Sequence, residues 1–442
     1  MSVQALDTTT VWARRYAPFL AVVLGGLPGW MAAIERLPFG HGTALAPLLH
    51  GLGDATAILG LSLFAASLVL MLRVGWLERA FGGLDSLYRA HHLVGVFSFL
   101  VLLIHPVTVG LRMLIRHGAA RALETTLPNP AHAAIFLGWI ALLWLMAMMI
   151  ATFLARLSYV GWKWLHASAG IAFLFGVAHL LLVRRTSEFA LPLLGLWIVA
   201  GVVALIWRLL IDRGAVAGRR YIVERARHLT DRIVELTLRP LGPPLAFAPG
   251  QFVFAAFCNT ADYRGCAEYH PFTIASPGGD SALRLIVKAL GDCTARMQDL
   301  RPGVPVRLQG PFGAFRPAAA GRPQTWIAGG IGVTPFLAMA DALPAEGPPI
   351  AFYYGVPSRQ EAACLDELER IAVRQPRLHL IPLFADRGEM PSIARIAADG
   401  GTLADREFFI CGPVGMVGTL TQELLARGVP EASNHTERFD FR

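Results

Sequence analysis

Charged residues are scarce in this 442-residue chain: Asp, Glu, Lys and Arg make up 16% of it, against 55% hydrophobic residues. Soluble proteins carry about 25% charged residues, so this composition argues against a wholly soluble chain and excludes a disordered one. Lysine is nearly absent, because only Lys163 and Lys288 stand among 39 basic residues. No basic cluster interleaves with aromatic residues in the second half, so we expect no nucleic-acid partner.

Cysteine is absent from residues 1–213, and no two of the five later cysteines have CxxC spacing. This spacing argues against a zinc site or a thioredoxin-type dithiol. We therefore expect five unpaired thiols, which suit a reducing compartment. They are Cys258, Cys266, Cys293, Cys364 and Cys411.

Residues 1–213 form an apolar half that contains only 15 basic and 8 acidic residues, whereas residues 214–442 contain 24 and 23. A bilayer core of about 30 Å takes about 20 apolar residues to cross as a helix. Six runs are long enough, at 16–34, 48–72, 90–114, 132–154, 161–183 and 190–211. Eleven basic residues flank the spans on the side of the membrane where the N-terminus lies, and six flank them on the opposite side. We therefore expect a multi-pass protein of a bacterial-type plasma membrane, with its N-terminus and its second half cytoplasmic.

The second half changes its pattern twice. From residue 214 to about 320, short segments with period-two alternation are separated by Pro and Gly turns, which predicts a small antiparallel β-barrel. From 321 to 442, strands alternate with helices, which predicts an α/β domain with a parallel sheet. The expected fold is therefore a six-helix membrane bundle over 1–213, followed by these two domains.

Four histidines form a pattern inside the apolar half. His91 and His105 lie fourteen residues apart in the third span, and His166 and His179 lie thirteen apart in the fifth. Each pair covers nearly four helical turns, or ~20 Å, and the two spans run in the same direction. One imidazole from each span at each of two levels can ligate two stacked haems. The alternative is that such histidines only hydrogen-bond between helices, and His92 competes with His91 as the ligand.

The segments LDSLYRAHHLVG, LLIHP, WLHASAG and VAHLLLV contain these histidines and resemble the ferric-reductase-like transmembrane domain. That family includes NADPH oxidases and ferric reductases. The resemblance implies two b-type haems held by four ligands, namely His91, His105, His166 and His179.

The second half resembles the ferredoxin–NADP reductase superfamily over residues 215–442. The first motif that carries this resemblance is HPFTIAS, at residues 270–276. This resemblance implies an FAD-binding barrel, with Thr273 suited to hydrogen-bond the flavin ring or ribityl chain. The implied flavin contacts are His270, Pro271, Phe272, Thr273, Ile274 and Ser276. The segment that follows the fifth barrel strand is implied to meet the FAD pyrophosphate through Lys288, Gly291, Cys293 and Thr294, partly by free N–H groups at a helix start.

The segment AGGIGVTP follows a strand and opens a helix, as a pyrophosphate-binding loop does. Its implied nucleotide contacts are Gly329, Gly330, Gly332, Thr334 and Pro335. The resemblance also implies a Rossmann-like NAD(P)-binding domain in which Cys411, Gly412 and Pro413 lie near the nicotinamide. Cys411 is alternatively a small buried hydrophobe.

Two features of this domain leave alternatives open. Ser358, Arg359 and Arg387 favour the 2′-phosphate of NADPH, although Asp386 beside Arg387 would repel a phosphate and NADH stays possible. In the chain end ERFDFR, an aromatic residue is implied to cover the flavin ring until nicotinamide displaces it. Phe439 is the first candidate and Phe441 the second; either is alternatively an edge-strand core residue.

Taken together, these motifs predict a lipid-embedded relay that passes electrons from NAD(P)H through FAD and two haems to a small acceptor outside. Oxygen would make the chain a superoxide-producing oxidase, and a ferric chelate would make it a ferric reductase. The alternative is a cytochrome subunit that feeds a periplasmic partner or a quinone. We expect no obligate protein partner, and a transporter would not need the flavin and nicotinamide motifs.

Overall fold

The computed structural model describes residues 3–36, 45–153, 157, 159–183, 188–212, 218–278, 282–316, 321–400 and 402–438. The chain divides into two compact units, Trp12–Arg213 and Met1–Val11 with Gly214–Arg442. Each unit has its own hydrophobic core. In the first, Phe64, Leu145 and Phe173 are buried at its centre.

The first unit is helical, and six of its segments are long and apolar enough to cross a membrane, which confirms the six predicted spans. The long helices are α1 (Val3–Arg36), α2 (Leu45–Leu70), α4 (Leu84–Thr126), α5 (Ala133–Phe153), the pair α6 (Tyr159–Ala167) and α7 (Ala169–Val183), and α8 (Leu191–Asp212), with the short α3 (Gly75–Phe81) between α2 and α4.

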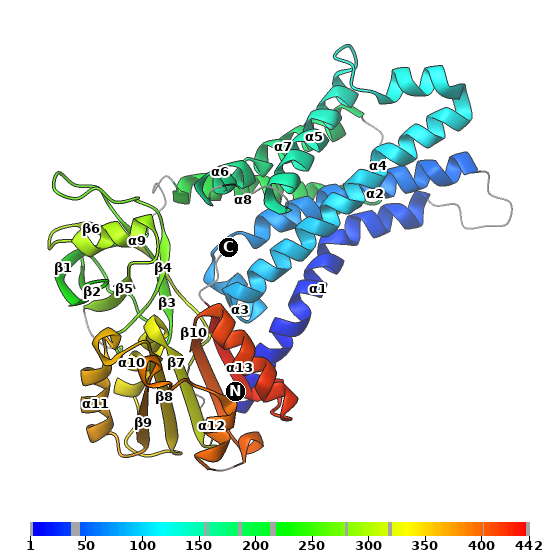
Figure 1. Ribbon diagram of the computed structural model, residues 1–442. Coiled ribbons are helices and arrows are strands. Elements are labelled where there is room, and N and C mark those ends of the chain that lie inside the picture. Colours follow the sequence, from blue (N-terminus) through cyan, green and yellow to red (C-terminus); the bar gives the residue numbers. More distant parts are fainter. Residues whose placement is uncertain are drawn as a thin grey trace. The chain divides into compact units, whose positions relative to one another are not determined.

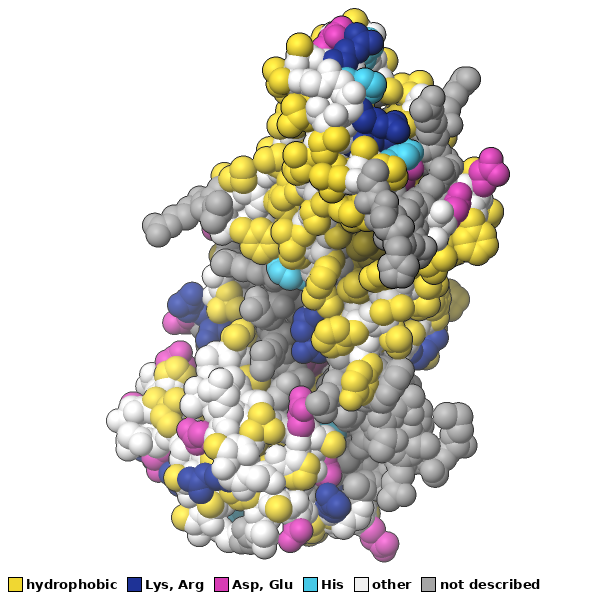
Figure 2. Space-filling model, turned by 90° about the vertical axis from the view of Figure 1, so that its right-hand side faces the viewer, with side chains coloured by type: hydrophobic (Ala, Val, Ile, Leu, Met, Phe, Trp, Pro, Cys, Tyr) yellow, Lys and Arg dark blue, Asp and Glu magenta, His cyan; other side chains and the backbone are white. Residues whose placement is uncertain are grey.

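Hydrophobic side chains cover the surface of this unit, as the yellow area of Figure 2 shows. Of the large hydrophobic side chains that are exposed in the described residues, only six lie after Leu210. A patch of this extent is unfavourable in water and natural in lipid, where helices satisfy their own backbone hydrogen bonds.

The fifth span differs from its prediction, because it is broken at Ser168 into α6 and α7. The Ser168 hydroxyl donates to the Leu165 carbonyl at 2.6 Å and accepts from Trp144 Nε1 at 2.9 Å. Serine hydroxyls that bond back to the preceding turn bend helices. His166 and His179 therefore lie within one candidate span, on either side of an irregularity at Ser168.

The FAD-type barrel is an antiparallel sheet with the order β4-β3-β6-β1-β2-β5, as predicted. Its strands are β1 (Arg219–Thr230), β2 (Ile233–Pro240), β3 (Phe252–Phe257), β4 (His270–Thr273), β5 (Leu283–Lys288) and β6 (Pro305–Phe312). An isolated bridge between Ile274 and Leu285 joins the chain after β4 to β5. The two ends of the sheet thus meet, and Val234, Leu236 and Leu238 fill the interior.

The last domain has a parallel sheet with the order β11-β10-β7-β8-β9, which confirms the predicted α/β architecture. Its strands are β7 (Gln324–Gly329), β8 (Ile350–Val356), β9 (Leu378–Phe384), β10 (Glu407–Gly412) and β11 (Asn434–Arg438). One face packs on α10 (Thr334–Asp341) and α11 (Leu365–Arg374), and the other on α12 (Ile393–Ala398) and α13 (Val414–Ala426) (Figure 1). The strand order reverses between β7 and β10, where ligands bind in such sheets.

Arg284 on β5 connects the barrel to the α/β domain. Its guanidinium bonds to Glu235 on β2 at 2.7 Å and to Glu367 on α11 at 2.8 Å. Burial disfavours the charge, but the two carboxylates outweigh burial and raise the pKa of Arg284 above its ordinary value. The charged form is therefore fixed at the junction of the two domains.

Candidate functional site

The four span histidines come together as two pairs of imidazole rings. The ring centroids of His91 and His166 are 5.9 Å apart, and those of His105 and His179 are 6.2 Å apart. Two imidazoles on opposite sides of one metal, with metal–nitrogen bonds of about 2 Å, have centroids about 6 Å apart. The spacing of both pairs therefore fits a bis-histidine haem.

Backbone carbonyls orient three of these rings. His91 Nδ1 bonds to the Ser67 carbonyl at 2.9 Å, and His105 Nδ1 bonds to the Gly53 carbonyl at 2.9 Å. His179 Nδ1 bonds to the carbonyl of Ala134 at 2.6 Å. Because a carbonyl only accepts, Nδ1 must carry the proton, and Nε2 is left as the ligand atom. Sequence reasoning missed these acceptors, since a backbone carbonyl leaves no residue-type signal.

The fourth ring is held differently. His166 Nδ1 is buried and has no hydrogen-bond partner among the residues that the structure describes. The Trp162 ring stacks on His166 with centroids 5.1 Å apart and planes inclined by 21°. Stacking fixes the plane of this imidazole without fixing its tautomer.

The choice between His91 and His92 has a geometric answer. The ring of His92 packs against Phe153 at 5.6 Å, whereas His91 faces His166. The arrangement therefore offers His91 as the partner of His166, and His92 as a packing residue of α4.

Glycines near the pairs have different surroundings. A Cβ on Gly95, one turn after His91, would meet nothing within 4 Å, so open space suitable for a porphyrin edge adjoins that ring. A Cβ on Gly170 would lie 2.7 Å from a methyl group of Leu205, so this glycine serves helix packing. Gly138, which sequence reasoning missed, lets His179 approach α5, because its Cβ would lie 2.9 Å from the ring.

The predicted flavin motif forms β4, which pairs with β3 through Pro271–Phe254 and His270–Ala255. The Thr273 hydroxyl is buried and has no hydrogen-bond partner within the described part of the chain. Buried hydroxyls are normally paired, so this atom fits a polar atom of a bound flavin. Phe272 and Ile274 are core residues, and Ser276 Oγ accepts from the Arg284 N–H at 3.3 Å.

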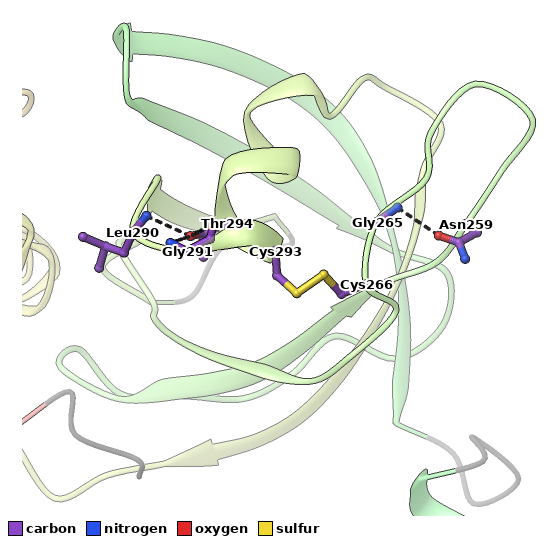
Figure 3. Close-up of a disulfide and its surroundings, with 7 residues drawn as sticks. All are labelled: Asn259, Gly265, Cys266, Leu290, Gly291, Cys293 and Thr294. Carbon is purple, nitrogen blue, oxygen red and sulfur yellow. Dashed lines mark hydrogen bonds between the residues drawn. A yellow bond between two sulfur atoms is a disulfide. The ribbon is translucent and has the colours of Figure 1, made fainter. Parts of the chain in front are cut away.

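The predicted pyrophosphate segment forms a tight turn before α9 (Asp292–Arg296). Thr294 Oγ1 accepts from the N–H groups of Leu290 and Gly291 at 2.9 and 3.0 Å (Figure 3). The hydroxyl that we expected at the FAD phosphates therefore stabilises its own turn. Lys288 closes β5 immediately before this turn.

The expectation of unpaired cysteines is wrong for one pair, because Cys266 and Cys293 form a disulfide (Figure 3). Cys258, Cys364 and Cys411 are free. The bonded pair is 27 residues apart in sequence, and barrel closure brings the β3–β4 loop beside α9. Local spacing carries no information about such a contact.

The glycine loop meets the CGP segment at the carboxyl ends of β7 and β10. A Cβ on Gly332 would lie 2.4 Å from the Cys411 carbonyl oxygen, and one on Gly329 would lie 2.8 Å from Met416. These two glycines therefore allow two loops to touch. Gly330 instead has φ of +53° and would meet nothing, so it is the glycine that faces open space. Thr334 and Pro335 begin α10 and are buried.

A cavity of about 270 Å³ lies between the barrel and the α/β domain. Lys288 and Arg232 line it from the barrel, and Gly330 and Tyr354 line it from the other side. Cavities between domains are common ligand sites. The structure thus brings Lys288, predicted at the FAD pyrophosphate, and Gly330, predicted in the nucleotide-binding loop, to the same space.

Cys411 is fully buried in β10, which ends at Gly412, and Pro413 then precedes α13. Burial raises the pKa of the Cys411 thiol well above its ordinary value, so the sulfur is uncharged at neutral pH. Phe439 and Phe441 lie outside the described residues. The described part of β11 ends at Arg438, which pairs with Gly412.

The predicted 2′-phosphate residues lie on adjacent turns. The Asp386 N–H donates to the Pro357 carbonyl at 3.0 Å, which joins the turn after β9 to the turn after β8 that contains Ser358. Arg359 pairs with Glu369 at 3.3 Å, and the Arg387 guanidinium lies 5.0 Å from the centre of the Phe384 ring. Both arginines therefore already have partners.

Comparison with known protein families identifies three consecutive segments. Residues 56–177 match the "Ferric reductase like transmembrane component" family. Residues 221–304 match an "FAD-binding domain", and residues 326–422 match an "Oxidoreductase NAD-binding domain". The first segment contains His91, His105 and His166 and ends two residues before His179, and the second contains the predicted flavin motif.

Curated relatives match part of the chain. The toluate 1,2-dioxygenase electron transfer component of Pseudomonas putida is 27% identical over 237 residues, which cover 50% of this chain and 68% of the relative. The phenoxybenzoate dioxygenase subunit beta of Ectopseudomonas oleovorans is 35% identical over 141 residues, covering 32% of this chain and 42% of the relative. Among solved structures, the flavohem-like FAD/NAD-binding domain of nitric oxide dioxygenase from Vibrio cholerae is 22% identical, with a TM-score of 0.43 over 50% of this chain and 98% of that one.

Proposed function

Because this chain joins a ferric-reductase-like transmembrane component to FAD-binding and NAD-binding oxidoreductase domains, we propose that it conducts electrons from NAD(P)H to an acceptor across the membrane. The chain is a multi-pass flavoprotein oxidoreductase with six candidate spans. The proposal adds the route, two bis-histidine haems in series, and the acceptor, O₂.

The two imidazole pairs carry this proposal. Both have the centroid spacing that an iron between two rings requires, and each pair takes one histidine from α4 and one from α6 or α7. Three of the four Nδ1 atoms bond to carbonyls, which leaves Nε2 to ligate. Histidines that served only to join helices could make the same carbonyl bonds, so the observation that distinguishes ligation is that the rings face each other in two pairs.

The cofactors supply the electron chemistry: NAD(P)H donates a hydride, flavin accepts two electrons and releases them singly, and haem iron takes one. The protein supplies positions for them. The unpaired Thr273 hydroxyl offers a hydrogen bond to flavin, and the open side of Gly330 admits a nucleotide beside Lys288. We propose NADPH as the donor, whose 2′-phosphate would draw Arg359 from Glu369 and Arg387 from the Phe384 ring.

The proposed direction of transfer is outward. The excess of basic residues on the N-terminal side of the spans supports a cytoplasmic FAD and NAD(P) module. The His91–His166 pair then lies at the inner level and the His105–His179 pair at the outer level. No obligate protein partner is needed in this scheme, because donor and acceptor are both small molecules.

The test uses purified protein in lipid nanodiscs with NADPH. We expect superoxide-dismutase-sensitive reduction of cytochrome c in air, with oxygen consumed in proportion. Rapid reduction of a ferric chelate under argon, with no superoxide in air, would replace the oxidase proposal by the ferric-reductase alternative. Failure of both, with reduction of a quinone or periplasmic cytochrome, would favour an electron-delivering subunit.

A further inference from the structure

A second set of metal-type donors lies in the other unit, at the predicted flavin-binding edge of the barrel. Glu268, His270 and Cys293 each present one ligand atom, and these atoms lie within 4.8 Å of one another. Cys266 contributes a second sulfur at the same place, because it is bonded to Cys293. All four side chains are half-buried.

Separate segments bring these donors together, and Figure 3 shows the two of them that are bonded, Cys266 and Cys293. The β3–β4 loop supplies Cys266 and Glu268, and the Gly265 N–H donates to Asn259 Oδ1 at 2.9 Å within this loop. Ala267, between the two donors, has φ of +51°, a left-handed conformation that side-chain-bearing residues rarely adopt. The first turn of α9 supplies Cys293, and the start of β4 supplies His270. The fold therefore brings the donors together from distant parts of the sequence. This is why the missing CxxC spacing, which we took as an argument against a zinc site, does not exclude one here.

The disulfide is not the stable form of this pair on the side of the membrane proposed above. Cytoplasmic thiols keep most protein cysteines reduced. Exchange with two molecules of a thiol, or with one dithiol, transfers two electrons and two protons to the pair and leaves the reductant as a disulfide. The products are two thiols beside an imidazole and a carboxylate.

We propose that the reduced pair binds Zn²⁺ together with His270 and Glu268. Two thiolates, one imidazole and one carboxylate are a tetrahedral donor set that suits zinc, a borderline-soft ion without redox chemistry. Binding displaces the two thiol protons; the two thiolates balance the charge of the ion, and the Glu268 carboxylate leaves the site with one net negative charge.

Zinc would replace the disulfide as the link between the β3–β4 loop and α9. The Cα atoms of Cys266 and Cys293 are 5.6 Å apart. Zn–S bonds of about 2.3 Å place the two sulfurs about 3.8 Å apart, so the loops need to separate by only about 2 Å. The linked segments flank the flavin motif in the sequence. When the disulfide is reduced, zinc therefore keeps the FAD-binding edge of the barrel in place.

The test uses the full-length protein in detergent, reduced with excess phosphine under argon, loaded with ZnCl₂ and freed of excess metal by gel filtration. We expect one zinc per chain, and Zn-edge X-ray absorption that shows two sulfurs at about 2.3 Å and two lighter atoms at about 2.0 Å. Haem iron does not interfere at this edge. Cys266→Ser lowers the sulfur count to one and weakens binding at least tenfold, and Glu268→Gln weakens it without changing that count.

Cys258→Ser is the matched control, because Cys258 is free and lies in the same loop; it leaves zinc content and spectrum unchanged. In the reduced protein, a zinc chelator speeds FAD release several-fold, whereas the oxidised protein does not respond. The proposal is overturned by reduced protein that retains no zinc, by zinc with no sulfur ligand, or by binding that Cys266→Ser leaves intact. A disulfide that resists reduction in the folded chain overturns it equally. None of these readouts depends on the electron acceptor.

Discussion

The helical unit and the unit that contains the barrel and α/β domain position their candidate cofactor contacts in different ways. In the helical unit, side chains provide the ligand atoms and the backbone only orients them, as the Ser67 and Gly53 carbonyls orient His91 and His105. In the second unit, the backbone forms the candidate nucleotide site. Gly330 faces open space there, and Gly332 allows the glycine loop to contact Cys411, because neither has a side chain. In a helix bundle, the position of a residue along its helix determines which side chains meet. At the ends of the strands, the close contact of two backbone segments holds the loops in place.

This comparison predicts the largest effect at a single imidazole. His105→Ala should remove one of the two proposed haems and lower NADPH-driven acceptor reduction at least 100-fold, because it deletes the imidazole that faces His179. Flavin reduction by NADPH should persist, since the second unit is intact. Pyridine haemochrome analysis gives the haem content. His92→Ala is the control and should retain both haems; a variant at His105 that also retained two bis-histidine haems would contradict the proposed relay.

In the second unit, the largest effect is expected from adding one carbon atom. Gly332→Ala places a Cβ 2.4 Å from the Cys411 carbonyl oxygen, so the glycine loop and the CGP segment must separate. NADPH-dependent flavin reduction should fall at least tenfold in stopped-flow measurements, with haem content unchanged. Gly415→Ala on α13, where an added Cβ meets nothing within 4 Å, should behave as wild type. Equal rates for the two variants would show that the contact is not needed.

A smaller effect is expected at the buried hydroxyl of the flavin motif. Thr273→Val keeps the shape and removes the hydrogen-bonding group, so the Kd for FAD should rise about tenfold, equivalent to ~1.4 kcal/mol. The apoprotein should unfold at the same or a higher denaturant concentration, because a buried hydroxyl without a partner is lost. A loss of apoprotein stability with unchanged FAD affinity would assign Thr273 to the core alone.

The smallest effect concerns alkaline stability of the α/β domain. Burial and a 2.9 Å hydrogen bond to Asp399 raise the pKa of Tyr353 to about 12, above the ordinary value of 10.0. The neutral phenol therefore stabilises the fold fully below pH 10, and this contribution is lost as pH rises from 10 to 12. Tyr353→Phe should flatten this part of the curve of stability against pH in denaturant titrations. An unchanged slope would show that Tyr353 does not titrate on unfolding.

Sequence patterns that depend on neighbouring residues predicted the fold well. Apolar run length located the six spans, and alternation located the barrel strands, because both reflect burial along a continuous segment. The strand β11 was missed, since its sequence NHTER is polar as befits a sheet edge. The break at Ser168 was also missed, because it depends on a hydroxyl bond that composition does not reveal.

The candidate site was predictable where it depends on side-chain type. The thirteen- and fourteen-residue spacings anticipated both imidazole pairs, although the choice of His91 over His92 needed the position of Phe153. Contacts made by fold closure could not be predicted, and the Cys266–Cys293 bond is the clearest example. The carbonyls of Ser67, Gly53 and Ala134 likewise have no signature, since every residue has one.

The two carbonyl acceptors on α2 have a consequence for how this chain can vary. Gly53 and Ser67 are fourteen residues apart, the same interval as His91 and His105, and α2 runs antiparallel to α4 so that each acceptor meets one ring. The two acceptors on α2 therefore have the same spacing as the two histidines on α4. One inserted or deleted residue between Gly53 and Ser67 would rotate one acceptor by about 100° and shift it by about 1.5 Å relative to the other. We therefore expect insertions and deletions to be tolerated in the connecting loops but not between Gly53 and Ser67.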